Sequence, residues 1–343
     1  MYLFSILAMK KLSVLLLNFF IPILLVIATY IWLDPFKVIM NYKTYYKPYN
    51  EVSLPLDKDY VSTATYDNHY LKEHYDSYIF GNSRSIFYGT KAWNKHIGQD
   101  SKPYHFDASN ETLFGIYRKI LYIDGKGEKI KNVLLIIDRQ LLLQTQPNEG
   151  HLFIISPQLV KYDNITDFHF TFMKAFFSYK FFPAYIDYKT SGVVKPYMTE
   201  DLLDDIPFHY VTATNEMTLD DSEKAIVNGT FYTPQRLKIF YKRSLTQKYS
   251  PKCIGEQQKA ILNAIVAIFR KHKTDYRIII NPLYNQEKLN STDTGYLKQR
   301  FGTKKVFDFS GINSFTNNYM NYYEASHYRP QVANAILQTA YSK

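Results

Sequence analysis

The sequence has a single cysteine, Cys253, among its 343 residues. One thiol excludes a disulfide framework and a thiolate zinc cluster within one chain. The sequence also lacks a P-loop, a glycine-rich dinucleotide turn, an internal repeat and any low-complexity tract, so it has none of the motifs of nucleotide-binding or repeat proteins. Apolar residues make up 46% of the chain and charged residues 21%, which excludes a mostly disordered protein.

Acidic residues are fewer than basic ones, 31 against 41, and the formal net charge is +10. The Lys and Arg residues are scattered, with no run of five and no zinc-finger, basic-zipper or RNA-binding motif, so the charge does not indicate nucleic acid as a partner. This positive charge either serves no particular partner or attracts an anionic membrane or an anionic glycan. The 17% content of Phe, Trp and Tyr suits a surface that stacks on ring-shaped partners, although codon bias would give the same composition.

One long uncharged run lies near the N-terminus, from Leu12 to Leu33. As a helix it would span roughly 33 Å, and a bilayer core is about 30 Å thick. Tyr30 and Trp32 lie where interfacial aromatic anchors belong. A cleaved signal peptide would have an apolar core of about 7 to 15 residues that ends in small residues, which this run does not. The sequence therefore predicts a short tail over 1–11 and an uncleaved transmembrane anchor over 12–33.

Residues 34–60 are rich in Pro, Tyr and Lys, which predicts a tether. From residue 61 onward, apolar runs of strand length alternate with stretches of helix length. The expected strands are Tyr78–Phe80, Tyr104–Phe106, Val133–Ile137, Tyr276–Ile280 and Val306–Phe309. The expected helices are 86–96, 112–124, 256–272, 284–300 and 329–341. This alternation predicts an α/β domain over 61–343, with a mostly parallel five-stranded sheet covered on both faces.

The alternation fails between Arg139 and Ser250, so we expect a large insertion at about 139–250. Its most unusual part is residues 168–188, where Phe and Tyr recur throughout. Such a segment forms either the local core of a lid or a surface that lies on a membrane or binds a partner. The sequence leaves both alternatives open.

Polar residues follow each expected strand, at the edge where ligands bind in doubly wound sheets. Ser83 lies in a turn directly after the first strand, where a helix N-terminus can stabilise a developing oxyanion. His327 follows the last strand, so both residues should lie at the same edge. Glu324 precedes His327 by three residues, a spacing at which its carboxylate can fix the imidazole tautomer. The alternatives are a helix cap at Ser83 and a loop-fixing hydrogen bond at His327.

These residues resemble the motifs of the SGNH (GDSL-type) hydrolase superfamily, especially its membrane-anchored extracytoplasmic branch, which includes accessory proteins of alginate acetylation and teichoic acid D-alanylation. Gly81–Ser83 is similar to the block that holds that family's nucleophile, and Glu324–His327 to the block that holds its acid and base. The strings IFGNSRS and SHYRPQVANAIL look like this branch in particular. The resemblance covers about 75–138 and 256–341, and it implies a doubly wound, flavodoxin-like sheet in 2-1-3-4-5 order.

Two departures from the family pattern concern the oxyanion. The family's second block offers a Gly N–H, and Ala108 stands at about that place, where its own N–H would serve. The third block supplies an Asn side chain, but here Asp138 ends the strand, and an ionised carboxylate only accepts hydrogen bonds, although it is equally suited to cap a helix. Asn110 and Arg139 are candidate substitutes for the missing donor. Arg84 is interpreted as a structural ion-pair partner rather than a catalytic residue, and it also stays a candidate to contact the oxyanion or the substrate.

The resemblance implies a serine acyltransferase or esterase in which Ser83 attacks an acyl ester, His327 moves the proton and Glu324 orients His327, with no metal or other cofactor. The expected substrate is an acyl group, acetyl in the first instance, on a cell-surface glycan. The family also implies a single-pass protein of the bacterial inner membrane with an extracytoplasmic C-terminal domain. The flanking Lys residues do not fix this topology, because they are nearly balanced, two before the anchor and three after it. The alternative is a catalytically degenerate scaffold that binds glycan and docks to a membrane-embedded acyltransferase or exporter.

Overall fold

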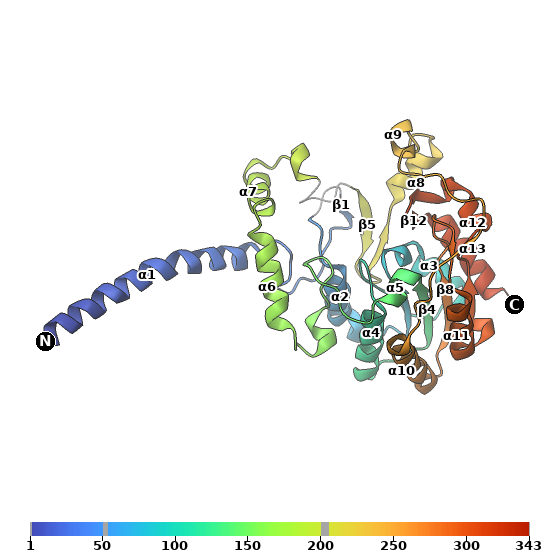
Figure 1. Cartoon of the computed structure of the whole chain (residues 1–343), viewed down its shortest axis with the longest axis horizontal. Helices are drawn as coiled ribbons and strands as arrows, with labels where there is room; N and C mark the ends of the chain where they lie inside the picture. Colours follow the sequence, from blue (N-terminus) through green and yellow to red (C-terminus); the bar gives the residue numbers. More distant parts are fainter. Residues whose placement is uncertain (1, 51–53, 200–205, 343) are drawn as a thin grey trace.

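The computed structural model describes three stretches of the chain, residues 2–50, 54–199 and 206–342. Helix α1 (Tyr2–Leu33) projects from the body of the molecule (Figure 1). Its segment Met9–Leu33 has a mean hydropathy of 2.5, and almost all of it is exposed. The Ser13 and Thr29 hydroxyls donate to carbonyls one turn earlier, so both are satisfied within the helix. By length and composition α1 can cross a membrane.

The body of the molecule is built on a parallel sheet of five strands. These are β2 (Ser77–Gly81), β3 (Pro103–Asp107), β4 (Asn132–Ile137), β8 (Asp275–Ile280) and β10 (Val306–Asp308). They lie in the order β3-β2-β4-β8-β10, and every neighbouring pair is parallel. Numbered along the chain this order is 2-1-3-4-5, so the predicted α/β class, strand set and strand order are confirmed.

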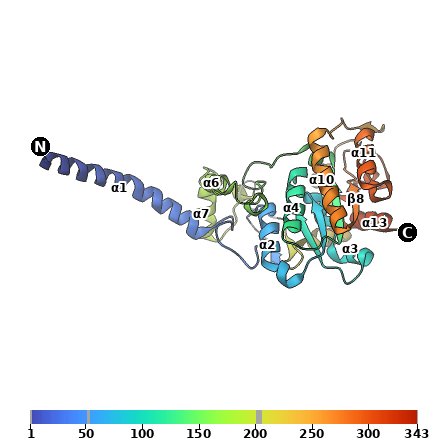
Figure 2. The same cartoon turned by 90° about the horizontal axis from the view of Figure 1, so that it is seen from below.

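Side chains alternate between the two faces of the sheet because successive residues of a strand point in opposite directions. In β2, Tyr78 and Phe80 lie in one core and Ile79 lies in the other. The first core is covered by α2 (Lys58–Glu73), α4 (Leu113–Gly125), α10 (Glu256–His272) and α11 (Ser291–Phe301). The second is covered by α3 (Thr90–Ile97) and α13 (Pro330–Tyr341). Figure 2 shows α4 and α10 side by side over the first face.

Two predicted helices begin elsewhere. Predicted helix 86–96 is divided into a short 3-10 helix, η1 (Ser83–Phe87), and α3. Predicted helix 284–300 begins only at Ser291, because the Asn290 side chain accepts a hydrogen bond from a backbone N–H of the first turn and caps the helix there. The remaining short elements of the C-terminal half are β7 (Lys248–Tyr249), β9 (Glu287–Lys288), the 3-10 helix η4 (Thr303–Lys305), α12 (Ser314–Asn317), the 3-10 helix η5 (Tyr319–Asn321), β11 (Tyr322–Glu324) and β12 (His327–Tyr328).

Residues 34–60 pack against the body of the molecule over their described positions. The Asp34 carboxylate accepts the Val38 N–H at 2.9 Å, which turns the chain back directly after α1. Tyr45 and Tyr46 are buried. The segment is therefore a folded connector that leads into α2, rather than the tether that its composition predicted.

The described part of the insertion after β4 contributes several helices and two strands of a small sheet. Its elements are α5 (Arg139–Leu143), α6 (Ile165–Phe176), α7 (Phe181–Ser191), β5 (Phe208–Val211), β6 (Glu216–Thr218), α8 (Asp220–Val227) and α9 (Pro234–Leu237). Strand β1 (Tyr49–Asn50) joins β5 and β6 in an antiparallel sheet. Phe172 and Phe176 of α6 are buried, and their rings contact Phe36 and Tyr30 of the N-terminal segment. The aromatic segment is thus a local core that joins the insertion to the base of α1.

Candidate active site

The turn after β2 places Ser83 at the carboxyl edge of the sheet. The turn is tight, because a Cβ at Gly81 would lie 2.9 Å from the Ile136 carbonyl oxygen, and only glycine fits there. The Asn82 side chain accepts the Arg84 N–H at 3.1 Å, which starts η1 at Ser83. As the first residue of that helix, Ser83 presents a backbone N–H that has no intrahelical acceptor.

Two side chains of the β11–β12 hairpin continue a line of polar contacts from Ser83. His327 Nε2 lies 2.8 Å from Ser83 Oγ, and His327 Nδ1 contacts Glu324 Oε1. The Ser326 N–H donates to the other Glu324 oxygen at 2.6 Å. Because a carboxylate only accepts, we assign the ring proton to Nδ1, which leaves Nε2 to accept the Ser83 hydroxyl proton. The structure brings together the three residues that the sequence singled out.

The charge of Glu324 and the exposure of His327 both suit this arrangement to proton transfer. Burial raises the pKa of Glu324, but the hydrogen bond and charge of His327, with the Ser326 N–H and Arg84, outweigh burial and lower it. Glu324 is therefore ionised at neutral pH and can stabilise a positive charge on the ring. The His327 side chain is 31% exposed, so a ligand can reach it.

Asp138 anchors the turns around the site. Its Oδ2 accepts hydrogen bonds from Asn82 Nδ2 and Arg84 Nη1, both at 2.8 Å, and from Asn281 Nδ2 at 3.2 Å. Its Oδ1 accepts the Leu141 N–H at 3.0 Å and caps α5. All four contacts require an acceptor, which explains why an acid stands here. Asp138 is thus a structural anchor and offers no donor to an oxyanion.

Arg84 connects the two loops that carry the site. Its Nη1 forms the ion pair with Asp138, and its Nε donates to the Ser326 carbonyl at 3.0 Å. The loop of Ser83 is thereby held against the loop of His327. Arg84 therefore positions the two loops, because both of these partners already occupy its guanidinium.

None of the other predicted oxyanion donors lines the cavity beside Ser83. The Ala108 N–H points to a strand carbonyl at 3.4 Å, a long contact. The Asn110 side-chain oxygen accepts a hydrogen bond at 2.8 Å from a neighbouring amide, and Asn110 lines a separate small cavity. The Arg139 Nε donates to a backbone carbonyl at 3.1 Å. Neither substitute, Asn110 or Arg139, lines the cavity of Ser83.

Ser109 is a site residue that sequence reasoning missed. It follows β3 in the next position after Ala108, and it lines the same cavity as Ser83, His327 and Glu324. The rule that selects residues at strand ends applies to Ser109 as well as to Ala108, so the signal was present. The Ser83 N–H and the Ser109 backbone and hydroxyl are the remaining candidate donors to an oxyanion.

The cavity beside Ser83 has a volume of about 300 Å³. Most of its wall is apolar and comes from segments far apart in the sequence, including Leu54, Ile86, Phe87, Phe153, Leu219 and Phe231. The Phe87 ring also lies against the His327 ring, with centroids 5.8 Å apart. No local sequence signal marks this wall, because the insertion and the connector supply much of it.

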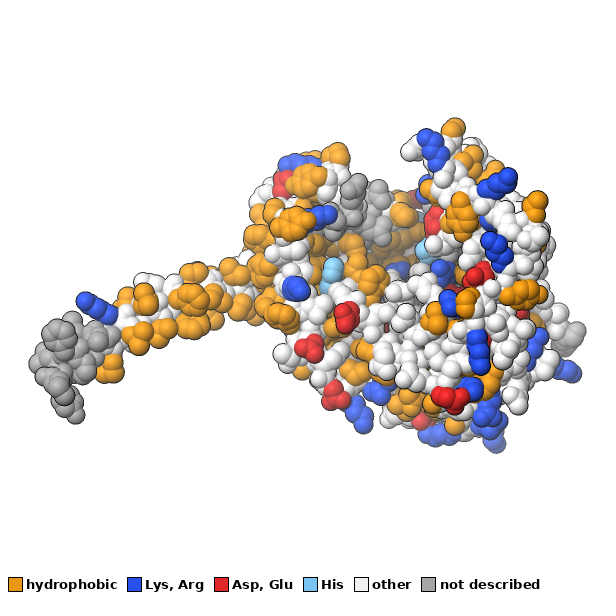
Figure 3. Space-filling view, in the orientation of Figure 1, with side chains coloured by type: hydrophobic (Ala, Val, Ile, Leu, Met, Phe, Trp, Pro, Cys, Tyr) orange, Lys and Arg blue, Asp and Glu red, His pale blue; other side chains and the backbone are white. Residues whose placement is uncertain are grey.

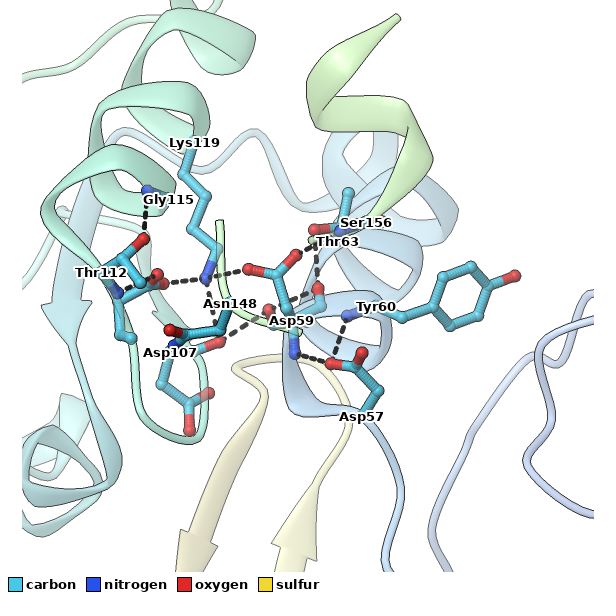
Figure 4. Close-up of polar contacts among 12 residues, drawn as sticks. Asp57, Asp59, Tyr60, Thr63, Asp107, Thr112, Gly115, Lys119, Asn148 and Ser156 are labelled. Atoms are coloured by element: carbon cyan, nitrogen blue, oxygen red, sulfur yellow. Dashed lines mark hydrogen bonds and ion pairs between the residues drawn. The ribbon is translucent and has the colours of Figure 1, made fainter. Parts of the chain in front are cut away.

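A second polar cluster lies around Lys119, Asp59 and Asp107 (Figure 4). It holds Asp107 and Glu111, the two ends of the loop that carries Ser109. Lys119 is completely buried, and its Nζ lies 3.0 Å from Asp59 Oδ2, contacts the Glu111 carboxylate and donates to the Asp107 carbonyl at 3.3 Å. Burial lowers the pKa of Lys119, but the two carboxylates outweigh burial and raise it. Burial raises the pKa of Glu111 to about 7, against the opposing effect of Lys119.

A second Ser–His pair lies two residues further along the turn. Ser85 Oγ donates to the Asn82 carbonyl at 2.8 Å and lies 3.0 Å from His105 Nε2. Since the hydroxyl proton is already used, His105 Nε2 must carry the ring proton and donate it to Ser85. Both side chains are fully buried, and His105 Nδ1 has no hydrogen-bond partner in the described chain.

Within the described residues, no group of three His, Cys, Asp or Glu side chains is placed to hold a metal ion. Comparison with known proteins gives no family: no protein-family model matches the chain, and no curated protein matches it. Function must therefore be argued from the residues of the site and their geometry.

Proposed function

We propose that this chain is a serine-dependent acyltransferase or esterase, similar in fold to the doubly wound SGNH hydrolases, that acts on acyl groups of a cell-surface glycan. The observation that carries the proposal is the line of contacts from Ser83 Oγ through His327 to Glu324, set at the carboxyl edge of a parallel sheet. Nucleophile, base and orienting acid are the three parts that acyl transfer through a serine requires.

The reaction has two half-reactions. Ser83 Oγ bonds to the ester carbonyl carbon while its proton passes to His327 Nε2, and the oxyanion accepts hydrogen bonds from the Ser83 N–H and Ser109. The carbon–oxygen bond of the ester then breaks, and the leaving alcohol takes the proton from His327. In the second half, water or a sugar hydroxyl gives its proton to His327 and attacks the acyl carbon. The acyl–Ser83 bond breaks and Ser83 recovers its proton.

We propose that α1 anchors the chain in a bacterial inner membrane, with the domain outside the cytoplasm. The length and composition of α1 support the anchor. The folded connector and the aromatic core of α6 hold the domain directly at the end of α1. This placement favours a substrate or donor that the membrane supplies, because it raises the effective concentration of that molecule at the domain. Protease added to spheroplasts should digest the domain and leave the anchor. A soluble chain that starts near residue 34 would contradict this topology.

The second candidate is a non-catalytic scaffold that binds glycan and docks to a membrane-embedded acyltransferase or exporter. One observation favours it: Asp138 can only accept hydrogen bonds, and neither Asn110 nor Arg139 lines the cavity beside Ser83. The loss of one oxyanion donor typically costs about 100-fold to 1000-fold in rate. The scaffold would keep the fold and the cavity while it lost turnover.

A fluorophosphonate probe separates the two candidates. On the full-length protein in detergent it should label Ser83, and the variants Ser83→Ala and His327→Ala should not be labelled. Ser85→Ala is the matched control, because Ser85 also contacts a histidine in the same turn but is buried. It should be labelled like the wild type. Full labelling of a folded His327→Ala variant would contradict the triad, and an unlabelled, folded wild type would favour the scaffold.

A further inference from the structure

The cavity beside Ser83 is larger than an acetyl group needs. An apolar cavity of about 150 Å³ holds benzene, which has six carbons, so a cavity of about 300 Å³ has room for on the order of ten carbon atoms. An acetyl group has two. Most of the wall surface is aliphatic and aromatic. Size and lining both indicate an alkyl chain as the occupant.

Two cationic side chains line the same cavity, Lys58 at the start of α2 and Arg236 of α9. The Arg236 guanidinium lies over the Phe231 ring, 3.8 Å from its centroid. Neither the Lys58 ammonium nor the Arg236 guanidinium forms an ion pair or hydrogen bond with the described residues. Asp107 shares a small side cavity with Lys58, but its carboxylate accepts a hydrogen bond from an amide at 3.1 Å.

Among the described residues of the cavity wall, Glu324 alone carries a carboxylate, and His327 and the Ser326 N–H already occupy it. The described wall therefore combines apolar surface with two cations that have no acidic partner of their own. Figure 3 shows the hollowed face beside α8 and α9, where hydrophobic side chains lie in the recess and Lys and Arg lie around it. A ligand that matches this wall carries both an alkyl chain and a negative charge.

We propose that the cavity binds an anionic amphiphilic ester whose acyl chain has about eight to ten carbons, and that Lys58 and Arg236 bind its anionic group. The inference rests on the proposed function, because it assigns the substrate class of the same serine site. It replaces the expected acetyl group with a longer chain. Such a substrate partitions to a membrane surface, and α1 would hold the domain next to that surface.

Binding can be tested without turnover. The full-length Ser83→Ala variant, in phosphatidylcholine nanodiscs, is titrated with octyl phosphate, ethyl phosphate and octanol by calorimetry, with empty nanodiscs subtracted. Octyl phosphate should bind at least ten-fold more tightly than either of the other two, because only it has both chain and charge. Equal affinity for ethyl phosphate would overturn the chain assignment, and equal affinity for octanol would overturn the anion assignment.

Variants of the wall assign the effect to residues. Arg236→Gln and Lys58→Gln should each weaken the binding of octyl phosphate at least five-fold and leave the binding of octanol unchanged. Arg300 is an exposed cation of α11 outside the cavity, so Arg300→Gln should change neither affinity. Met217→Trp places a larger side chain in the wall and so narrows the cavity. It should lower the octanoyl-to-acetyl ratio of kcat/KM for 4-nitrophenyl esters at least ten-fold. An unchanged ratio in a folded Met217→Trp protein would count against the chain pocket.

The two proposals fail in different ways. If the probe does not label Ser83 but octyl phosphate binds as described, the enzyme proposal fails and the ligand class stands. If Ser83 is labelled and octyl phosphate binds no better than ethyl phosphate, the enzyme proposal stands and the assignment of an amphiphilic ligand to the cavity is wrong.

Discussion

Two Ser–His pairs lie two residues apart in one turn of this protein, and they differ in almost everything else. Ser83 and His327 open onto the cavity, and Glu324 contacts the far side of the imidazole. Ser85 and His105 are fully buried, and the far ring nitrogen of His105 has no hydrogen-bond partner in the described chain. The distances are almost the same, 2.8 Å and 3.0 Å.

The difference lies in which nitrogen holds the proton. Glu324 places the proton of His327 on Nδ1, so Nε2 is free to accept the serine proton. Ser85 gives its proton to a backbone carbonyl, so His105 donates to it and cannot act as a base toward it. Burial also lowers the pKa of His105, which keeps that ring neutral. A short Ser–His distance therefore identifies a nucleophile only together with a carboxylate and a path for the ligand.

Removing the carboxylate should make the first pair resemble the second. In Glu324→Gln the amide can turn its NH₂ toward Nδ1 and favour the wrong tautomer, so the rate of fluorophosphonate labelling should fall by up to about 10⁴-fold. The free energy of unfolding should change by less than about 1 kcal/mol, because Glu324 is partly exposed. Labelling rates and thermal unfolding measure the two effects. Labelling at the wild-type rate would mean that Glu324 does not orient His327.

The same contrast between buried and accessible polar groups can be drawn for lysine. Lys119→Met leaves two carboxylates buried without their cation and should cost about 3 to 5 kcal/mol of stability. Lys271→Met is the control, since Lys271 is 64% exposed and its ion pair with Asp124 should be worth less than about 1 kcal/mol. Thermal unfolding in detergent compares them. An equally small loss in both variants would show that the buried cluster does not hold the Asp107–Glu111 loop.

Part of this molecule could be predicted from the sequence. The five strands and their order follow from apolar runs and from the family resemblance. Ser83, His327 and Glu324 follow from strand ends and residue spacing together with the same resemblance. Lys119 could not be predicted, because a lysine in an amphipathic helix is normally solvated and its two acids lie on other segments. The apolar wall of the cavity could not be predicted either, because it is assembled from the connector and the insertion, which carry no motif.

The buried cluster also predicts a pH effect of definite sign. The folded pKa of Glu111 is about 7, above its ordinary value, so between about pH 4.5 and 7 the folded protein keeps a proton that the unfolded chain releases. Its contribution to stability is complete below this window and is lost as pH rises through it, by up to about 3 kcal/mol. Glu111→Gln mimics the protonated acid and should flatten this decline.

Unfolding of wild type and Glu111→Gln is therefore compared at pH 5, 6, 7 and 8. The groups that face Glu111 are Lys119 of α4 and Asp59 of α2, and both are unchanged in the variant. His105 contributes with the opposite sign, because its pKa is lowered and its stabilisation is lost as pH falls below about 6.5. The difference between the two proteins isolates Glu111. A difference that does not grow from pH 5 to 8 would contradict the raised pKa.

The smallest effect is expected at Ser85, where the comparison between the two pairs is tested most directly. Ser85→Ala removes the acceptor of the His105 proton and leaves a buried ring with no partner, which should cost about 1 to 2 kcal/mol of stability. Labelling of Ser83 should stay within about three-fold of wild type, because Ser85 reaches neither the cavity nor His327. Thermal unfolding and labelling rates on one preparation give both values. If labelling instead falls more than ten-fold in a folded variant, the buried pair positions the turn that carries Ser83, and the separation between a structural pair and a reactive pair is wrong.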